Sequence, residues 1–301
     1  MTMGIPHIDV CICTFRRPQL LQKLLLELAA IETKGRFHYS ITIADNDRNE
    51  SARDVVQSLA AKVPVTISYC VEPVQNIALA RNRILQHGNG DFIALIDDDE
   101  LPSKTWLCAL FSTYEKTQAD GVLGPVLPYF PDDVPDWFKK SGIYDFRKRH
   151  PTGSKLHWGE CRTGNALIRR QVFESLPGPF REEFGTGGED QDFFRRAVEQ
   201  GCEFVWCDEA VVHEIIQPSR YDRRVLLSRA LLRGRDTFKH RRNRRRNLAK
   251  ALIAVPVYSL ALPFFLLGGQ HRFMKLANQL TSHIGLLLAC VGLNPMRHRE
   301  M

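Results

Sequence analysis

The chain has 301 residues, 44% of them hydrophobic and 25% charged, so it can bury a sizeable core and is neither disordered nor fibrous. Its 41 Lys and Arg residues outnumber its 34 Asp and Glu residues, for a formal net charge of +7. The excess is local: 13 of these basic residues and two acidic ones lie between Gln217 and Lys250, which leaves 28 bases against 32 acids elsewhere. This distribution argues against a uniformly basic nucleic-acid-binding protein.

Apolar runs suited to strands alternate with helical patterns along the first half of the chain. The runs that predict strands occur over residues 8–13, 39–44, 65–71, 91–96 and 121–127. The patterns that predict helices lie between them, over residues 18–31, 51–61 and 76–86 and from Ser103 onward. This alternation predicts the α/β class, with an open, mostly parallel, Rossmann-like sheet and helices on both faces.

The periodic pattern stops after residue 127. Residues 128–160 are rich in Pro, Trp, Tyr and basic residues, which predicts a mobile, functional loop. A strand is predicted again over residues 162–168, a helix after Glu189 and a strand around Val211. The eight cysteines include no CxxC pair, and we interpret them as buried, reduced thiols of a cytosolic protein.

The two ends of the chain differ in their expected relation to a membrane. The N-terminus lacks a basic stretch, and Asp9 interrupts its apolar run, so no signal peptide is expected. Residues 251–269 are 19 residues without a charge, and residues 276–293 add 18 more with only His283, close to the ~20 that a spanning helix needs. One interpretation is a helical hairpin packed on the soluble part. Membrane association as a short hairpin or as in-plane helices is favoured, because the basic run at residues 241–246 resembles a cytoplasmic anchor.

Polar side chains follow the predicted strands at the sheet edge where ligands of parallel sheets bind. The first strand ends in Thr14-Phe15-Arg16-Arg17, the second in Asp45-Asn46-Asp47 and the fourth in Asp97-Asp98-Asp99-Glu100. Four consecutive carboxylates suit Mg²⁺ or Mn²⁺, which bind a few carboxylates together with phosphate oxygens. The alternative is a solvated acidic start of the next helix. Neither GxGxxG nor GxxxxGK[ST] is present, which argues against a dinucleotide fold or a P-loop.

A second group of acidic residues follows a glycine-rich stretch. Residues 185–188 (GTGG) precede Glu189 and Asp190 at a predicted helix start, and glycines let the backbone approach a ligand closely. A carboxylate in this place can act as a general base. The alternative for Asp190 is a helix N-cap. His213 follows an apolar strand and either completes a metal site or packs in the core.

Six short motifs follow one another along the chain: TFRRP at residues 14–18, DN at 45–46, NIALARN at 76–82, IDDD at 96–99, TGN at 163–165 and GED at 188–190. In this order they resemble glycosyltransferase family 2, whose members have the GT-A fold. The resemblance covers roughly residues 8–213 and is closest to bacterial exopolysaccharide enzymes of the succinoglycan glucosyltransferase type.

The resemblance implies a glycosyltransferase that uses a nucleotide-sugar donor and Mn²⁺ or Mg²⁺. Asp99, as the last acid of a DxD motif, would bind the metal, and Asp190 would take the proton of the acceptor hydroxyl. The implied sites are the nucleotide-sugar site, with Thr14, Arg16, Asp45, Arg81, Asp97 and Asp98; the metal site, with Asp99 and His213; the catalytic pair Asp190 and Glu189; and the acceptor site, with Trp158, Gly164, Asn165 and Arg220.

The implied reaction is a single displacement that inverts the anomeric carbon, with a metal-stabilised nucleoside diphosphate as leaving group. UDP-hexose, with UDP-glucose favoured, is the expected donor. Processive synthases of the family carry a Gln-x-x-Arg-Trp motif, whereas residues 217–221 read QPSRY here. The sequence also lacks a long array of spanning helices. We therefore expect the addition of one sugar.

The basic segment at residues 217–250 interleaves arginine with leucine and is poor in aromatic residues. This composition and the apolar segments that follow favour an anionic membrane surface over nucleic acid as its partner. The cations would also suit the head group of an acceptor saccharide linked to polyprenyl diphosphate. The alternative is a solvated, inert cationic helix face.

These inferences divide the chain into a catalytic domain at residues 1–216, a basic amphipathic segment at residues 217–250 and hydrophobic membrane-associated helices at residues 251–301. Within the catalytic domain, residues 1–127 would be the nucleotide-sugar half and residues 128–216 the acceptor half. The expected place of action is the cytoplasmic face of the bacterial inner membrane, in exopolysaccharide or cell-surface polysaccharide synthesis. The alternatives are the same fold with a protein or simple lipid acceptor, and a non-catalytic membrane-bound nucleotide-sugar-binding protein.

Overall fold

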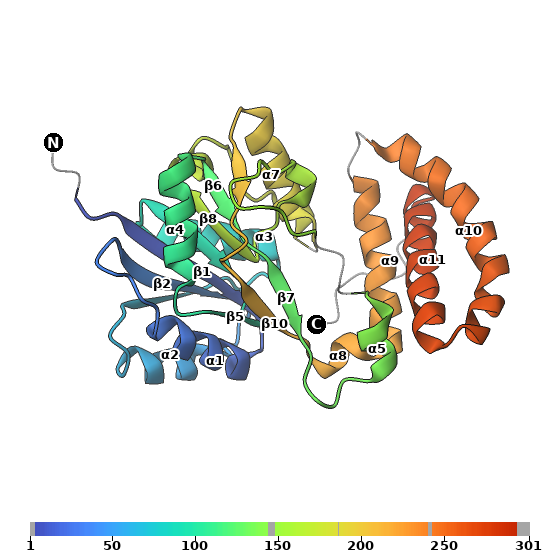
Figure 1. The fold of residues 1–301 in the computed structure, drawn as a ribbon, viewed down its shortest axis with the longest axis horizontal. Helices are drawn as coiled ribbons and strands as arrows, with labels where there is room; N and C mark the ends of the chain where they lie inside the picture. The colour runs from blue at the N-terminus through green and yellow to red at the C-terminus, as the bar shows by residue number, and fades with distance from the viewer. Residues whose placement is uncertain (1–3, 144–147, 186, 240–242, 294–301) are drawn as a thin grey trace. The chain divides into compact units, whose positions relative to one another are not determined.

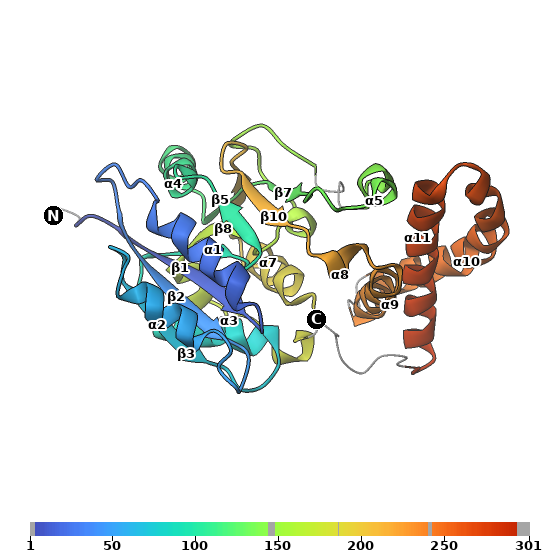
Figure 2. The same ribbon diagram turned by 90° about the horizontal axis from the view of Figure 1, so that it is seen from below.

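The computed structural model describes residues 4–143, 148–185, 187–239 and 243–293. The chain forms two compact units (Figures 1 and 2). The first, which we call the catalytic unit, comprises Met1–Tyr129 and Arg147–Ile215. The second, the helical unit, comprises Phe130–Phe146 and Ile216–Met301.

A seven-stranded sheet forms the centre of the catalytic unit, with the strand order β3-β2-β1-β4-β8-β6-β9. Every neighbouring pair is parallel except those that β8 forms with β4 and β6. The predicted mostly parallel α/β sheet is thereby confirmed. The strands are β1 (His7–Thr14), β2 (His38–Asp45), β3 (Ile67–Val71), β4 (Phe92–Ile96), β6 (Gly121–Leu123), β8 (Asn165–Arg169) and β9 (Phe204–Trp206).

The antiparallel direction of β8 positions the site. Asn165, its first residue, lies opposite Ile96, the last residue of β4. The segment that enters β8 therefore reaches the same sheet edge as the four acids that follow β4, Asp97 to Glu100, which we call the acidic run. A small second sheet lies beside this edge and contains β5 (Glu100–Pro102), β10 (Val212–Ile215) and β7 (Val126–Tyr129).

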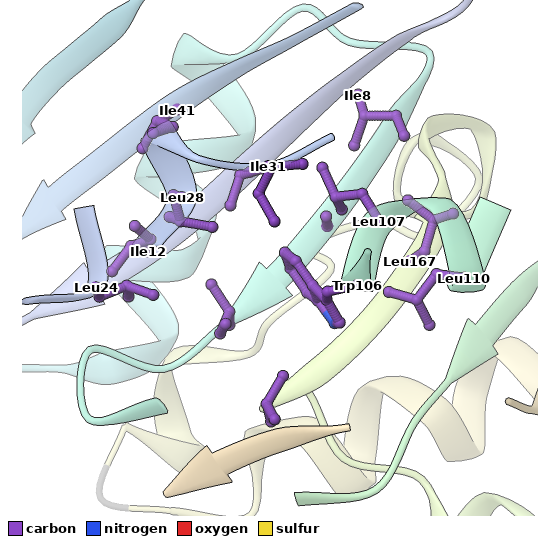
Figure 3. Packing of buried hydrophobic residues seen from close by; sticks show 14 of the residues in the cluster. Ile8, Ile12, Leu24, Leu28, Ile31, Ile41, Trp106, Leu107, Leu110 and Leu167 are labelled. Atoms are coloured by element: carbon purple, nitrogen blue, oxygen red, sulfur yellow. The ribbon is translucent and has the colours of Figure 1, made fainter. Parts of the chain in front are cut away.

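Helices cover both faces of the large sheet, as predicted. Alternate strand residues point to opposite faces: Ile8, Val10 and Ile12 of β1 join one apolar cluster and Cys11 joins the other. Trp106 and leucines of α1 complete the first cluster (Figure 3). The helices of the first face are α1 (Pro18–Ala29), α2 (Arg53–Ala60) and α4 (Trp106–Thr117), and those of the second are α3 (Ile77–His87), α6 (Arg170–Glu174) and α7 (Glu189–Glu199).

The structure corrects two boundaries drawn from the sequence. The strand predicted over residues 121–127 is two strands, β6 and β7, because the chain passes close to Ala210 and Asn165 at Gly124, where a Cβ would collide with both. The segment predicted as a loop over residues 128–160 contains the short helix α5 (Asp136–Ser141) and a 3₁₀ turn at Trp158–Glu160.

The helical unit contains α5, α8 (Pro218–Tyr221), α9 (Arg223–Lys239), α10 (Arg244–Leu267) and α11 (Gln270–Cys290), which confirms the expected basic and hydrophobic C-terminal helices. Two glycines allow α9 and α11 to pack closely. A Cβ at Gly234 would collide with the backbone of Ser282, and one at Gly285 would collide with the carbonyl of Leu231. Among the described residues, α10 is the helix that is long and apolar enough to cross a membrane, judged by length and composition alone.

Candidate active site

The carboxyl ends of β1 and β4 bring together the residues of the acidic run and the arginines after β1. Asp98 is buried, and its carboxylate accepts hydrogen bonds from Thr14 Oγ1 at 2.8 Å and from Arg17 Nη1 at 2.9 Å. The same Arg17 nitrogen donates to Asp99 Oδ2 at 3.1 Å. Burial raises the pKa of Asp98 above its ordinary value, against the opposing effects of Arg17 and Thr14. Arg17 thus places one positive charge between the two adjacent acids.

Sequence reasoning missed the part that Arg17 plays. Arg16 and Arg17 were equivalent candidates as neighbours in one motif, and the prediction chose Arg16. The structure separates them: the Arg16 side chain is 60% exposed, whereas that of Arg17 is 23% exposed and reaches the acidic run. Arg16 adopts a left-handed φ of 54°, which turns the chain at this point. The pair of arginines directly before a Pro-initiated helix was the available signal.

Arg81 connects the acidic run to the start of α7. It is buried in α3, its guanidinium forms an ion pair with Glu189, and its Nη2 lies 3.6 Å from Asp97 Oδ1. Asp97 is the open member of the acidic run, because 49% of its side chain is exposed. The predicted contact of Arg81 with donor phosphates stays a prediction, and in this structure its guanidinium is paired with two carboxylates.

Glu100 and Gly164 complete the support of Asp97. Glu100 is buried and accepts a hydrogen bond from the Asp97 backbone N–H at 3.0 Å. A Cβ at position 164 would lie 2.6 Å from Glu100 Oε1 and 3.4 Å from Asp97 Oδ2. Glycine is therefore required here for the carboxylates to pack against the backbone, so Gly164 shapes the acidic run.

Asp190 lies in the first turn of α7, at the positive end of the helix dipole. The N-cap residue is Gly188, with a φ of 90°, so Asp190 does not cap the helix. Its Oδ1 accepts from the Gln191 backbone N–H at 2.7 Å, and its Oδ2 lies 3.9 Å from Arg162 Nε. Its side chain keeps 18% of its surface exposed, which leaves the carboxylate able to meet a substrate.

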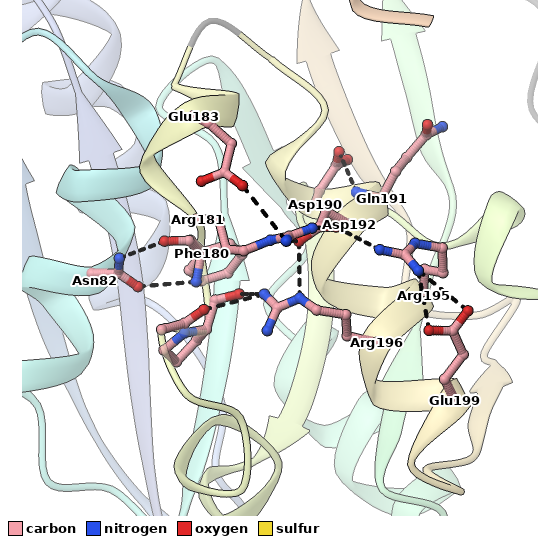
Figure 4. Close-up of polar contacts among 12 residues, drawn as sticks. Asn82, Phe180, Arg181, Glu183, Asp190, Gln191, Asp192, Arg195, Arg196 and Glu199 are labelled. Carbon is pink, nitrogen blue, oxygen red and sulfur yellow. Dashed lines mark hydrogen bonds and ion pairs between the residues drawn. The ribbon is translucent and has the colours of Figure 1, made fainter. Parts of the chain in front are cut away.

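Asp192 lies two residues after Asp190 in α7 and, unlike Asp190, is enclosed by other side chains (Figure 4). Its side chain is 1% exposed, and it pairs with Arg181, Arg195 and Arg196. Burial opposes ionisation, but hydrogen bonds from the three arginines hold the pKa of Asp192 below its usual value. Asp192 therefore stabilises the fold of this helix.

The expected base-binding residues form a turn after β2. Asp45 is fully buried, and its carboxylate accepts hydrogen bonds from Asp47 N at 3.1 Å, Ala52 N at 2.8 Å and Tyr69 Oη at 2.9 Å. Arg16 Nε donates to Asp47 Oδ2 at 3.1 Å, so the turns after β1 and β2 are joined. Asp45 shapes this turn, and its direct contact with a nucleotide base stays a prediction.

The remaining predicted site residues have varied surroundings. Asn165 is buried and its side-chain amide is hydrogen bonded to Trp106 Nε1 and to the carbonyls of Pro125 and Ala210, so it joins the strands at this edge. Trp158 packs partly buried against the second apolar cluster. His213 is exposed on β10, opposite Leu101 of β5. Arg220 lies in α8 of the helical unit.

The acidic run fits a divalent cation by its chemistry. Within the described ranges, no three His, Cys, Asp or Glu side chains are close enough together to enclose an ion, so His213 is not part of a preformed cage. Mg²⁺ and Mn²⁺ are commonly held by one or two carboxylates, with substrate phosphates and water as the other ligands. The exposed Asp97 and the neighbouring Asp99 can supply such carboxylates.

The chain is similar to known glycosyltransferases over the residues that form this site. The model of the family described as "Glycosyl transferase family 2" matches residues 9–176, and that described as "N-terminal domain of galactosyltransferase" matches residues 146–217. The succinoglycan biosynthesis protein ExoM of Rhizobium meliloti (strain 1021) is 39% identical over 218 residues, covering 71% of this chain and 68% of ExoM.

Solved structures show the same fold. The mannosyltransferase PcManGT from Pyrobaculum calidifontis, in complex with GDP-Man and Mn²⁺, matches with a TM-score of 0.62 and 16% identity, over 95% of this chain and 88% of that one. Residues 1–349 of S. aureus TarS, in complex with UDP, match with a TM-score of 0.52 and 14% identity, over 96% of this chain and 93% of that one. At these identities the likeness establishes the fold alone.

Proposed function

The chain belongs to glycosyltransferase family 2, and we propose that it transfers one sugar from a nucleotide sugar to a lipid-linked saccharide in bacterial exopolysaccharide or cell-surface polysaccharide synthesis. UDP-hexose, with UDP-glucose favoured, is the proposed donor. The likeness to ExoM supports the pathway class, and the UDP and GDP-Man complexes of the structural neighbours support a nucleotide-sugar donor.

The observation that carries this proposal is the position of Arg81 between two acidic groups. It pairs with Asp97, the open carboxylate after β4, and with Glu189, the neighbour of Asp190 at the start of α7. One buried cation therefore ties the proposed donor side to the residue next to the proposed catalytic base. Such fixed placement of reacting groups is what a transfer between two substrates requires.

In the proposed reaction Asp190 takes the proton of the acceptor hydroxyl while that oxygen attacks the anomeric carbon. The bond to the nucleoside diphosphate breaks on the opposite face of the sugar, so the configuration inverts. Asp97 and Asp99 would hold Mn²⁺ or Mg²⁺, which supplies positive charge to the leaving diphosphate. Thr14 and Arg17 hold the Asp98 carboxylate in place by hydrogen bonds. Glu189 remains in its ion pair with Arg81, so Asp190 is the carboxylate that accepts the proton.

The proposed acceptor is a saccharide on polyprenyl diphosphate at the cytoplasmic face of the inner membrane. The experiment that tests the function supplies labelled nucleotide sugars, one at a time, to the full chain with Mn²⁺ and membrane lipid-linked oligosaccharides. We expect one donor to give a lipid product longer by one sugar, with inverted anomeric configuration. A product ladder or a retained configuration would contradict the proposal, as would the absence of transfer from every donor.

The proposed metal site makes a separate prediction through Asp99→Ala. Binding of the preferred nucleotide sugar should weaken about tenfold in Mn²⁺, because a carboxylate ligand of the cation is lost. In EDTA the parent and variant should bind alike, as measured by calorimetry. Asp120→Ala, a partly exposed acid at the far end of the sheet, is the matched control and should bind as the parent does in both conditions. Equal losses for Asp99→Ala in Mn²⁺ and EDTA would argue against metal ligation.

A further inference from the structure

We propose that the helical unit binds lipid from one side, with α10 lying in the plane of an anionic membrane leaflet without crossing it. This proposal rests on the proposed function in one respect: an enzyme that acts on a lipid-linked acceptor works at a membrane. Its observations come from the helical unit alone. The surface concerned is the α10 stripe, which we define as Ile253, Val257, Leu260, Phe264 and Leu267.

The α10 stripe is continuous and exposed. Its members follow one another at intervals of four, three, four and three residues, which places them on one face of a helix. Their exposed fractions are 67%, 53%, 75%, 72% and 90% in chain order. From residue 253 to residue 267 the stripe is about 21 Å long, and the exposed Leu252 and Leu266 adjoin its two ends, so this is an extended apolar surface of a kind that marks an interaction site.

The charges around the α10 stripe favour lipid as its occupant. Arg245, Arg246 and Lys250 are exposed at the start of α10, and neither α10 nor α11 contains an acidic residue. An anionic leaflet offers apolar chains to the stripe and negative head groups to these cations at the same time. The α10 and α11 faces of a second copy would offer the cations no carboxylate.

The position of α11 decides against a spanning α10. After a turn at Gly268–Gly269, α11 runs back along α10 (Figures 1 and 2), and the Tyr258 and His283 rings lie 5.8 Å apart. The outer surface of α11 carries exposed Arg272, Lys275 and Gln279. A spanning α10 would draw this polar surface into the hydrocarbon, where charged side chains are strongly disfavoured.

The packing of α11 on α9 adds a second constraint. The close contacts at Gly234 and Gly285 and the hydrogen bond from Arg233 to Asn278, at 2.8 Å, hold the two helices together. The arginine-rich α9 would therefore have to follow α11 into the bilayer. With α10 in the plane of the leaflet, the α10 stripe meets lipid while α9 and α11 keep their polar surfaces in water.

Depth measurements test this orientation. Ile253→Trp and Leu260→Trp are made separately in the full chain and bound to vesicles of phosphatidylcholine and phosphatidylglycerol that carry bromine at known acyl positions. Quenching beyond that of the parent protein reports the distance of each position from the bilayer centre. An in-plane α10 predicts equal, shallow depths, whereas a spanning α10 places Leu260 near the bilayer centre and Ile253 about 10 Å further out, since seven residues separate the two positions. The second result would overturn the proposal.

A charge placed on the α10 stripe tests its occupant. Leu260→Glu should reduce partition into these vesicles at least about tenfold, as measured by sedimentation. Gln279→Glu adds the same charge to the exposed surface of α11 and should partition as the parent does. If Leu260→Glu instead changes the oligomeric state and leaves partition unaltered, the stripe is a contact between copies and the proposal fails. None of these readouts needs sugar transfer, so shallow binding without transfer would refute the proposed function alone.

Discussion

The two units of the protein depart from ordinary globular patterning in opposite ways. The catalytic unit buries charged side chains, among them Arg81, Asp98 and Asp192, whereas the helical unit exposes large apolar ones such as Leu260 and Phe264. Each departure is costly unless something compensates for it. In the catalytic unit the compensation lies within the chain, as ion pairs. In the helical unit we propose that it lies outside the chain, in lipid.

The acidic side chains of the catalytic unit divide into two kinds. Asp192 is enclosed by three arginines, whereas Asp97 and Asp190 keep open carboxylates beside paired neighbours. The first kind stabilises the fold and the second kind is available to substrates. Three substitutions test this division.

The largest expected effect is that of Asp190→Asn on sugar transfer. Loss of a general base should lower the rate by about 10²–10⁴-fold, because the neighbouring carboxylate, Glu189, is held in its ion pair with Arg81. Donor binding and Tm should remain those of the parent. Glu199→Gln, which removes the same charge from the other end of α7, is the matched control and should retain transfer. Transfer by Asp190→Asn at more than half the parental rate would remove Asp190 from this role.

A smaller effect, on stability, is expected from Asp192→Asn. Removing the shared partner of three arginines should lower the free energy of unfolding by about 2–3 kcal/mol, below the value for a fully buried pair because the arginines are partly exposed. Since the folded-state pKa of Asp192 lies below its usual value, its contribution is present at neutral pH and is lost as pH falls through that folded value.

Thermal unfolding of the parent and of Asp192→Asn across pH measures this contribution. The difference in Tm should be constant above about pH 5 and should shrink at more acid pH, below the unfolded value of an aspartate. A difference that stays the same down to pH 2 would show that the ion pairs are not its source.

The smallest expected effect is that of Arg17→Ala on the cation dependence of stability. Without Arg17, Asp98 and Asp99 lie together without their shared cation, so Tm without metal should fall by an amount that corresponds to about 1 kcal/mol. Addition of Mn²⁺ should then raise Tm more in this variant than in the parent. Arg16→Ala removes the exposed neighbouring arginine and should respond as the parent does. Equal responses of the two variants would contradict the part assigned to Arg17.

Much of the fold could be predicted from the sequence because its signals are local. Apolar periodicity predicts the strands and helices, and Asn76, the first residue of the helix predicted over residues 76–86, caps α3, where its side chain accepts hydrogen bonds from Ala78 N and Leu79 N. The acidic run after β4 was visible as a motif. The direction of β8 was not predictable in this way, because pairing between distant segments leaves no local trace.

The candidate site was predictable in its motifs and less so in its individual members. Arg16 and Arg17 are adjacent and chemically alike, yet only Arg17 reaches the acidic run. Glu100 and Gly164 entered the arrangement through a close approach of two segments that are far apart in the chain. Which of several like residues serves a site depends on the direction of each side chain, and that direction is a property of the folded chain.

The sequence by itself determined that this protein is an α/β glycosyltransferase of family 2 with an acidic run, a glycine-led pair of acids and a basic and apolar C-terminal region. These features are carried by residue type and spacing, which are already present in the unfolded chain. Only the tertiary structure decided that Arg81 joins Asp97 to Glu189, that Asp192 differs from Asp190, and that α10 exposes its apolar stripe while α11 packs on α9. Each of these depends on which distant surfaces are brought into contact, and contact exists only after folding.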